Sequence, residues 1–488
     1  MALAKPATLH DRDAEWAALA RFATDARPGP TLGVVYGRRR QGKTYLLDAL
    51  TARVGGMLHV AVQDVAPRAL ADVGATLARH IGAPVPLAFP DWPSVVDALL
   101  DLGAKGGPVV AVLDELPYLT ASSPELPSVI QRALGPGSPR AQTSQTRLIV
   151  CGSAMSVMSG LLTGTAPLRG RAALELIVHP FDYRETATFW KLGDPELAVT
   201  VHAVVGGTPA YRDLLREDAP ESLGDFDNWV IRAVLDPASP LAREGRYLLA
   251  EEPSITDRAL YHAILTAIAE GRTRRGQIAQ AVGRPDNQLS HPLNVLRDLR
   301  LVTQRDDVLR ARRPTFAITE PIMRFHHAIV RPQTSRLERG QITQAWRAAA
   351  PTFRAQILGP HFEELAREWT GRIAEPETIG GDVDQVGATV VTDPKQRRTY
   401  EVDVVALGVP DRGRRPLLLL GEAKWQREPL GVGDLARLER VRSLLDARDD
   451  LDARATRLAL FSRSGFDRSV ESRSDVVLVD LERLFEGV

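Results

Sequence analysis

The sequence predicts a multidomain α/β protein, and three observations lead to this prediction. The chain has 488 residues, which is more than a single hydrophobic core usually organises. Near the amino terminus an apolar run, a glycine-rich loop and a helical pattern follow one another. In the last third, short apolar runs alternate with amphipathic segments and carry acids and a lysine at fixed spacing. We therefore expect a parallel-sheet domain followed by smaller modules.

The composition is that of a globular protein, with 44% hydrophobic and 25% charged residues. The 61 basic and 61 acidic residues give a formal net charge of zero, so a surface for a polyanion must be local. The single cysteine, Cys151, rules out an internal disulfide framework and a thiolate-rich metal site. Met1–His10 is too short and polar for a signal sequence, and no apolar run approaches a membrane span. We expect a cytoplasmic protein without a membrane partner.

The glycine-rich loop has the spacing of a P-loop, Gly37-x4-Gly42-Lys43-Thr44. Leu32–Tyr36 before it is predicted as a buried strand, and Tyr45–Leu50 after it as a helix. Such a loop wraps phosphates with backbone N–H groups, its lysine reaches the β- and γ-phosphates, and its hydroxyl ligates Mg²⁺. The alternative is a glycine-containing turn before a helix. The residues predicted to contact a nucleoside triphosphate here are Gly37, Arg38, Arg39, Arg40, Gln41, Gly42, Lys43, Thr44 and Tyr45.

Two acids follow the apolar run Pro108–Leu113, which is predicted as a parallel strand buried on both faces. Ligands gather at the carboxyl ends of such strands. Asp114 is therefore predicted to hold Mg²⁺ through water, and Glu115 to polarise the attacking water. The alternative is a helix cap.

Polar residues at two further positions suit the same site. Ser153 follows the predicted strand Arg147–Cys151 and could sense the γ-phosphate, or it could belong to a simple strand-ending turn. Arg171 lies in a glycine-flanked loop and could stabilise transition-state charge in cis or on a neighbouring subunit. A solvated loop arginine is the alternative for Arg171.

Other segments complete the predicted first domain. Asp11–Ala23 has an amphipathic helical pattern, Met57–Val62 is predicted as a strand, and Ala66–Ile81 as a helix. Asp182–Leu215 is helical, apart from a turn at Gly206-Gly207-Thr208-Pro209.

The motifs GRRRQGKT, VLDELPYL, LIVCGSAMSVM, PLRGR and GGTPAY, in this order, resemble the archaeal-type ATPases of the signal-transduction (STAND) branch of AAA-like P-loop proteins. The resemblance implies that the nucleotide is ATP, that Pro209 touches the base, and that Arg171 is the family arginine. The family's amino-terminal pattern, a hydrophobic residue followed by Gly-Arg-Glu, is similar to His10-Asp11-Arg12-Asp13, in which the glycine is missing.

Ile255–Phe316 has a different character and is predicted to be a winged helix. Helical patterns at Arg258–Ala269, Arg274–Val282 and Asn287–Leu299 precede two short strands, Leu301–Arg305 and Pro314–Ile318. Between Ile255 and Thr315 there are eleven arginines, no lysine and six acids, a local excess of five positive charges. We expect contact with double-stranded DNA; the alternative is an intramolecular lid or an oligomerisation surface. The arginines expected on the DNA face are Arg272, Arg274, Arg275, Arg297, Arg300, Arg310, Arg312 and Arg313.

The last third is predicted as a separate module. His361–Ala374 is a helix, Ala388–Thr392, Arg398–Leu407 and Pro416–Leu420 are strands, and a helix (Gly433–Leu445) and a strand (Arg457–Ser462) follow. Asp403 lies in one strand, while Glu422 and Lys424 are two apart in the next and so share a face. Two carboxylates and a backbone carbonyl suit Mg²⁺, and a lysine can orient or activate water. A surface ion pair is the alternative.

This order of elements resembles the PD-(D/E)xK nuclease fold, αβββαβ, with the motif Asp403…Glu422-Ala423-Lys424. The family also places a glutamate on the first helix, which matches Glu363 or Glu364, and the resemblance implies that Glu363, Asp403 and Glu422 hold the metal. FSRSGF at Phe461–Phe466 resembles the close of the C-terminal module in the ATPase family.

The predicted domains are a P-loop ATPase with a helical lid (1–250), a winged helix (251–331), a linker (332–350) and a restriction-endonuclease-like module (351–488). The predicted function is ATP binding and hydrolysis, DNA engagement, and Mg²⁺-dependent cleavage by Asp403, Glu422 and Lys424. The rival hypothesis is an ATP-controlled assembly switch, a possible homo-oligomer, whose last module binds nucleic acid or protein without cutting.

Overall fold

The computed structural model describes residues 3–104, 106–250, 252–410 and 413–486, apart from the side chains of 311–313. The chain forms two compact units. Unit 1 contains Met1–Pro180, Thr208–Ala210 and Ala250–Ser254, and unit 2 contains Phe181–Gly207, Tyr211–Leu249 and Ile255–Val488. In the described ranges, no helix combines the length and apolar character that crossing a membrane requires. The boundaries between the four predicted segments stay a prediction.

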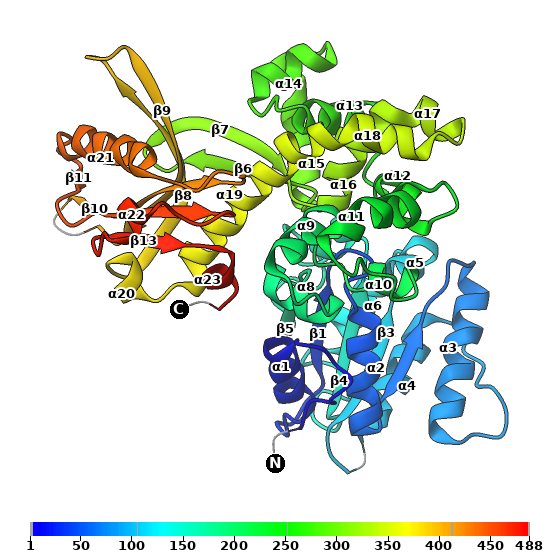
Figure 1. Cartoon of the computed structure of the whole chain (residues 1–488). Helices are drawn as coiled ribbons and strands as arrows, with labels where there is room; N and C mark the ends of the chain where they lie inside the picture. Colours follow the sequence, from blue (N-terminus) through cyan, green and yellow to red (C-terminus); the bar gives the residue numbers. More distant parts are fainter. Residues whose placement is uncertain (1–2, 105, 251, 411–412, 487–488) are drawn as a thin grey trace. The chain divides into compact units, whose positions relative to one another are not determined.

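Unit 1 is built on a five-stranded parallel sheet with the order β2-β3-β4-β1-β5 (Figure 1). The strands that precede the P-loop and the Asp114-Glu115 pair are thus separated by β4. Four strands match the predicted ones, but β5 was not predicted; its residues are half-buried or exposed, unlike those of the buried strands. The strands are β1 (Thr31–Tyr36), β2 (Met57–Val60), β3 (Val109–Asp114), β4 (Thr146–Gly152) and β5 (Ala172–Ile177).

Helices on both sides bury this sheet. In α1 (Asp13–Ala23), Trp16, Leu19 and Phe22 are buried, as the amphipathic pattern predicts. They share a core with Leu46, Leu47 and Leu50 of the helix that follows the P-loop. The other helices of this unit are α2 (Lys43–Val54), α3 (Ala66–Ile81), α4 (Trp92–Asp101), α5 (Leu116–Ser122), α6 (Leu126–Ala133) and α7 (Met155–Gly160).

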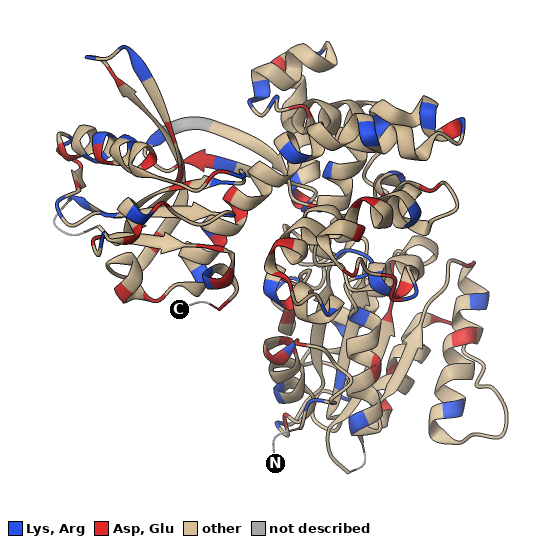
Figure 2. Ribbon diagram, in the orientation of Figure 1, with Lys and Arg blue, Asp and Glu red and all other residues tan. Residues whose placement is uncertain are grey.

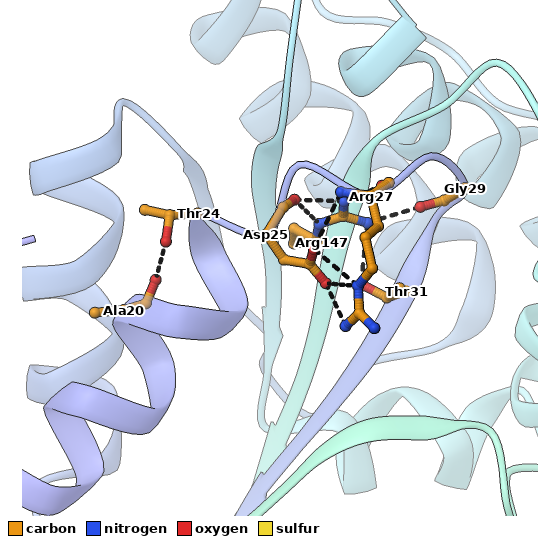
Figure 3. A network of polar contacts seen from close by, with 7 residues as sticks. All are labelled: Ala20, Thr24, Asp25, Arg27, Gly29, Thr31 and Arg147. Atoms are coloured by element: carbon orange, nitrogen blue, oxygen red, sulfur yellow. Dashed lines mark hydrogen bonds and ion pairs between the residues drawn. The ribbon is translucent and has the colours of Figure 1, made fainter. Parts of the chain in front are cut away.

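The loop between α1 and β1 is fixed by Arg147 of β4 (Figure 3). The Arg147 side chain is fully buried. Its guanidinium donates to the carbonyl oxygens of Asp25 (2.5 and 3.0 Å), Arg27 (2.6 Å) and Gly29 (2.7 Å). A further N–H reaches Thr31 Oγ1 at 3.2 Å. One side chain therefore satisfies the polar backbone of the segment that leads into the P-loop strand.

Unit 2 begins with helices where the sequence predicts one helical region. Asp182 caps the first of them with a complete capping box, and Asp194 caps the second. The breaks between them lie at Lys191, in the left-handed conformation, and at the Gly206-Gly207 turn. These helices are α8 (Tyr183–Trp190), α9 (Pro195–Val205), α10 (Ala210–Leu214), α11 (Leu223–Trp229) and α12 (Glu244–Ala250).

Three helices and a two-stranded antiparallel hairpin follow, in the order that predicts a winged helix. The hairpin is longer than expected, and the third helix starts later, at Ser290, after a 3₁₀ turn at Asp286–Leu289. The winged-helix interpretation stays a prediction. The elements are α13 (Arg258–Ala269), α14 (Arg275–Val282), α15 (Ser290–Asp298), β6 (Val302–Asp307), β7 (Arg310–Ile318) and α16 (Pro321–Phe325).

Residues 332–350 were expected to be a linker between domains, and this role stays a prediction. Most of the segment is helical, in α17 (Thr334–Glu338) and α18 (Ile342–Thr352). Trp346 of α18 is 2% exposed and packs its ring against Phe325 and Phe353. Burial of this aromatic ring favours an ordered conformation of the segment.

The last module is a mixed sheet with the order β13-β12-β10-β9-β8 and the short β11 beside β10. Strands β8, β9 and β10 form an antiparallel meander, while β12 and β13 add in parallel. Helix α19 covers one face, and α21 covers the other. The elements are α19 (Gly359–Glu368), α20 (Pro376–Ile379), β8 (Val383–Asp393), β9 (Arg398–Gly408), β10 (Arg415–Lys424), α21 (Val432–Asp446), β11 (Leu451–Asp452), β12 (Arg457–Ser462), α22 (Arg468–Glu471), β13 (Val476–Val479) and α23 (Leu481–Glu486).

Candidate functional site

The P-loop lies between the carboxyl end of β1 and the amino end of α2. A Cβ atom at Gly37 would lie 2.4 Å from the carbonyl oxygen of Val178, so the loop needs glycine there. Gly42 has φ 84° and starts the helix. Lys43 Nζ folds back and donates to the carbonyl oxygen of Arg38 at 2.8 Å. This is the curled loop that a phosphate-binding function requires.

Thr44 and Asp114 meet across the sheet. Thr44 Oγ1 donates to Asp114 Oδ2 at 2.5 Å, although β1 and β3 are separated by β4. A hydroxyl and a carboxylate oxygen side by side are ligands that Mg²⁺ accepts, with water and phosphate oxygens completing the shell. These two residues fit the metal that the sequence predicts.

Glu115 is held by the residue at the tip of the intervening strand. Ser153 Oγ donates to both carboxylate oxygens of Glu115, each at 3.0 Å. Arg39 of the P-loop donates from Nε to Ser153 Oγ at 3.3 Å and also hydrogen-bonds the hydroxyl of Tyr118. The loop, the predicted sensor and the predicted catalytic acid are therefore one hydrogen-bonded network. Tyr118 was missed by the sequence reasoning because nothing local marks it.

The turn Thr208–Ala210 belongs to unit 1 and lies against the P-loop. Gln41 Nε2 donates to Thr208 Oγ1 at 3.0 Å, and the backbone N–H of Ala210 reaches the carbonyl oxygen of Arg40 at 3.4 Å. A Cβ atom at Gly42 would lie 3.9 Å from Pro209 Cγ. Pro209 is therefore beside the loop, and its contact with a nucleotide base stays a prediction.

The amino-terminal segment reaches the same loop. Arg12 is 5% exposed and donates from one terminal nitrogen to the carbonyl oxygen of Gln41 at 3.2 Å. Asp11, which replaces the family's glycine, has φ 49°, in the left-handed region where glycine is favoured. Asp11 therefore adopts a conformation that glycine adopts more readily.

Burial lowers the pKa of Lys43, and the charges of Glu115 and Asp114 only partly oppose this shift. An added negative charge near Lys43 would stabilise the protonated form of this lysine. Burial also raises the pKa of the Cys151 thiol on β4 well above its usual value, so this thiol is neutral and unreactive.

Arg171 is not brought to this site within the chain. It is exposed and directly precedes β5, whose residue Ala172 pairs with Leu32 at the beginning of β1. The P-loop begins after Tyr36, which pairs with Ile177 at the other end of β5. Five residues of strand separate these levels, about 16 Å at the usual rise. The in cis interpretation of Arg171 is therefore wrong, and only a contact with a neighbouring subunit stays a prediction.

A second group of charged side chains lies in unit 2. Lys424 Nζ is 2.6 Å from Glu422 Oε1 and 3.7 Å from Asp403 Oδ2, so the lysine bridges neighbouring strands. The backbone N–H of Ala423 donates to Asp403 Oδ2 at 3.0 Å. Burial, and then the charge of Asp403, raise the pKa of Glu422. Burial acts to lower the pKa of Lys424, but Asp403 and Glu422 outweigh it and raise the value.

Arginines that the sequence reasoning missed complete this group. Arg437 of α21 donates to Glu422 Oε1 at 2.8 Å, and Arg367 of α19 donates to the carbonyl oxygen of Asp403 at 2.7 Å. Glu422 Oε2 is buried and has no hydrogen-bond partner among the described residues. A buried carboxylate oxygen without a hydrogen-bond partner, in a polar site, fits a cation. The ligands of this cation would be Asp403, Glu422 and the Ala423 carbonyl.

The helix glutamates behave differently from each other. Glu364 forms ion pairs with Arg305 of β6 and with Arg324, the latter at 2.9 Å. Glu363 faces the group: burial, and then the charge of Asp403, raise its pKa to about 7. Among the described residues, however, no three His, Cys, Asp or Glu side chains lie close enough to hold a metal ion. The predicted three-carboxylate set Glu363, Asp403 and Glu422 is therefore not assembled in this structure.

A groove of about 1070 Å³ runs between α19, the β8–β9 strands and the β6–β7 hairpin. Asp403 and Glu363 line it, together with Arg274, Arg305 and Arg310. Other arginines of the expected DNA face lie outside the groove and are exposed, and two of them pair with acids: Arg272 with Glu270 and Arg275 with Asp286. The side chains of Arg312 and Arg313 lie outside the described residues.

Comparison with solved structures finds similar proteins that cover about two thirds of this chain. No family model and no curated protein matches the chain. The solved Walker-type ATPase PABY2304 of Pyrococcus abyssi is similar with a TM-score of 0.51 and 20% identity, over 65% of this chain and 96% of that one. The ORC2 protein of Aeropyrum pernix in ADPNP and ADP complexes gives 0.44 and 16%, over 71% and 97%. The ORC1 protein of the same organism in complex with DNA gives 0.33 and 16%, over 68% and 95%. The first of these likenesses shows a shared P-loop ATPase fold.

Proposed function

We propose that this chain binds and hydrolyses ATP at the P-loop of unit 1 and that the nucleotide controls its engagement of double-stranded DNA. One observation carries the ATPase part. Thr44, Asp114, Glu115 and Ser153 form a hydrogen-bonded set around the P-loop, with separations of 2.5 to 3.0 Å. Phosphoryl transfer needs little else from a protein than positioned charges and a positioned water.

The roles follow from the geometry. Lys43 and the loop N–H groups bind the phosphates, and Thr44 and Asp114 would hold Mg²⁺, which would supply positive charge to the phosphate oxygens. Glu115 orients the attacking water, and Ser153 fixes the carboxylate in place. Pro209, beside Gly42, packs on the base. The hydrogen bond between Gln41 and Thr208 ties this base-contacting turn to the loop.

The test of the ATPase is Lys43→Ala. Turnover should fall at least about a hundredfold because a cation aimed at the transferred phosphate is lost. Arg53→Ala, an exposed change later in α2, is the matched control and should leave turnover unchanged. Unchanged turnover in Lys43→Ala would contradict the proposal that ATP is hydrolysed at this P-loop.

The DNA part rests on the winged-helix order of α13, α14, α15 and the β6–β7 hairpin, and on the local arginine excess. Binding of a labelled duplex to the full chain, measured in ADP and in a non-hydrolysable ATP analogue, tests this part. A chain that binds no duplex in either nucleotide contradicts it.

A second candidate function is metal-dependent cleavage of a phosphodiester in the C-terminal module. The observation that favours it is Lys424, which bridges Asp403 and Glu422. In such a site Asp403, Glu422 and the Ala423 carbonyl would hold Mg²⁺, which would stabilise charge on the phosphate, while Lys424 orients the attacking water. The rival is a switch whose last module binds without cutting. Nicking of a supercoiled plasmid in Mg²⁺, compared with ATP-dependent change in molecular mass, separates the two.

A further inference from the structure

The tip of the β6–β7 hairpin is seated on strand β8. The backbone N–H of Val308 donates to the carbonyl oxygen of Ala388 at 3.3 Å, and Thr389 Oγ1 donates to Asp307 at 2.6 Å. Val308 and Leu309 pack against the core that β9, β10 and α21 share. Gly387 makes room for this seat, because a Cβ atom there would lie 2.4 Å from Val308 Cγ1. In this structure the hairpin tip is therefore covered by strand β8 of the same unit.

The seat places the hairpin beside another arm of the same unit. Beyond Thr389, β8 and β9 continue to a turn at residues 394–397, which we call the arm end. Arg310, at the start of β7, donates to Thr392 Oγ1 at 3.3 Å, close to this turn. Figure 2 shows basic segments toward the free end of the β8–β9 arm.

The cations at the arm end have no acidic partners. Lys395 and Arg397 are exposed, and no ion pair among the described residues includes either of them. The nearest acid in sequence, Asp393, is fully buried and pairs with Arg440 at 2.6 Å. Many surface charges are simply solvated, and this is the alternative for Lys395 and Arg397.

Acids inside the adjoining groove are mostly paired. Glu364 pairs with Arg305, Glu368 with Arg372 at 3.1 Å, and Asp384 with Arg415. Arg310, which lines the groove, and Lys395 and Arg397 at the arm end together form what we call the rim, and none of the three takes part in an ion pair among the described residues. A polyanion would meet the rim first.

The groove begins beside the arm end, at Thr392 and Thr399, and extends to Asp403 of the candidate cleavage group. Thr399, Glu401 and Asp403 alternate along β9, and all three line the groove. From Arg398 to Asp403 the strand covers about 17 Å at the usual rise per residue. A nucleic acid chain that contacts the rim with one phosphate would therefore reach Asp403 within a few nucleotides.

We propose that the rim formed by Arg310, Lys395 and Arg397 binds the phosphate backbone of a nucleic acid and guides it along β9 toward Asp403. The β6–β7 hairpin forms one side of this rim. Its tip is held by β8, and Arg310 next to the tip is thereby placed near the arm end. This inference rests on the proposed engagement of DNA and extends it to the C-terminal module.

The experiment compares charge-reversal pairs in the full chain, with a fluorescent duplex titrated at several salt concentrations. Lys395→Glu with Arg397→Glu should weaken binding at least about tenfold at 0.1 M salt and lower the salt slope by about two, because two phosphate contacts are lost. The control pair Arg336→Glu with Arg339→Glu makes the same charge change on α17 and on the residue that follows it, where both side chains are exposed. It should leave the affinity within about twofold of wild type.

A second variant tests the seat without altering any charge. Gly387→Val forces the tip of the β6–β7 hairpin off β8 and should weaken DNA binding several-fold, although every cation remains. Gly433→Val on α21, where a side chain meets nothing within 4 Å, is its control. Circular dichroism and nucleotide affinity confirm that both variants are folded.

The outcomes separate the two proposals. If the wild type binds the duplex and the arm-end pair binds as tightly as the control pair, the rim is refuted and the proposed DNA engagement stands. If the wild type binds no duplex in any nucleotide, the proposed function fails, and the rim fails with it.

Discussion

Replacing Arg147 by methionine should destabilise unit 1 severely while leaving its residue volume nearly unchanged. The guanidinium serves three carbonyl groups, those of Asp25, Arg27 and Gly29. Hydrogen bonds from a charged donor contribute about 1.5–3 kcal/mol each. The segment is half-buried to exposed, so some of its carbonyls can find water after rearrangement. We therefore expect a loss of about 3–5 kcal/mol, a large part of the roughly 5–15 kcal/mol that stabilises a typical domain.

The assay is urea unfolding with and without ATP and Mg²⁺, since the transition that shifts with nucleotide belongs to unit 1. Arg140→Met is the control: Arg140 makes ion pairs with Asp97 and Asp101 at 3.0 and 2.7 Å, but near the surface. Its loss should cost less than about 1 kcal/mol. An Arg147→Met variant within about 1 kcal/mol of wild type would refute the reasoning that this one side chain holds the segment before β1.

Three further outcomes are expected. Gly37→Ala should abolish nucleotide binding, measured by calorimetry, because its Cβ atom would lie 2.4 Å from the Val178 carbonyl oxygen; full affinity contradicts this. Glu422→Gln should remove Mg²⁺-dependent plasmid nicking and leave ATP turnover intact, and nicking at the wild-type rate counts against the site. Burial lowers the pKa of His202 to about 3, so the unfolded chain takes up a proton below about pH 6.5 that the folded chain does not. Stability is thus complete above about pH 6.5 and declines as the pH falls toward 3, by about 2 kcal/mol at pH 5 for this group. His202→Gln should reduce the difference in unfolding free energy between pH 7.5 and pH 5, whereas the exposed His291→Gln should not; equal slopes for all three proteins would refute it.

The nucleotide site could be predicted from sequence because its parts are local. The spacing of glycines and lysine from Gly37 to Thr44 predicts the shape of the loop. Asp114 follows an apolar run that predicts a buried strand. Proximity of Thr44 to Asp114 then follows from the parallel sheet, since ligand-binding residues share one edge of it.

Pairings between distant segments could not be predicted in the same way. Arg171 looked suitable by residue type, but its level on the sheet depends on the register of β5 against β1, which no local pattern encodes. Arg437 reaches Glu422 from the following helix with no motif to mark it.

Two further features were not predicted from the sequence. Residues 332–350 looked like a polar linker, yet Trp346 packs against Phe325 and Phe353, and this contact stabilises the helical conformation of the segment. The hydrogen-bonded seat of the β6–β7 hairpin on β8 depends on Gly387, a residue that sequence reasoning passed over.

The most direct test of nucleotide-controlled DNA engagement is the duplex affinity of Glu115→Gln in ATP and in ADP. This variant keeps Lys43, Thr44 and Asp114, so it should bind ATP without hydrolysing it and remain in the ATP state. A ligand shifts a conformational equilibrium only by its differential affinity for the two states. We predict that the duplex affinity differs at least about tenfold between the two nucleotides, which corresponds to about 1.4 kcal/mol of coupling. Equal affinities in ATP and ADP, with both nucleotides shown to be bound, would contradict the proposal.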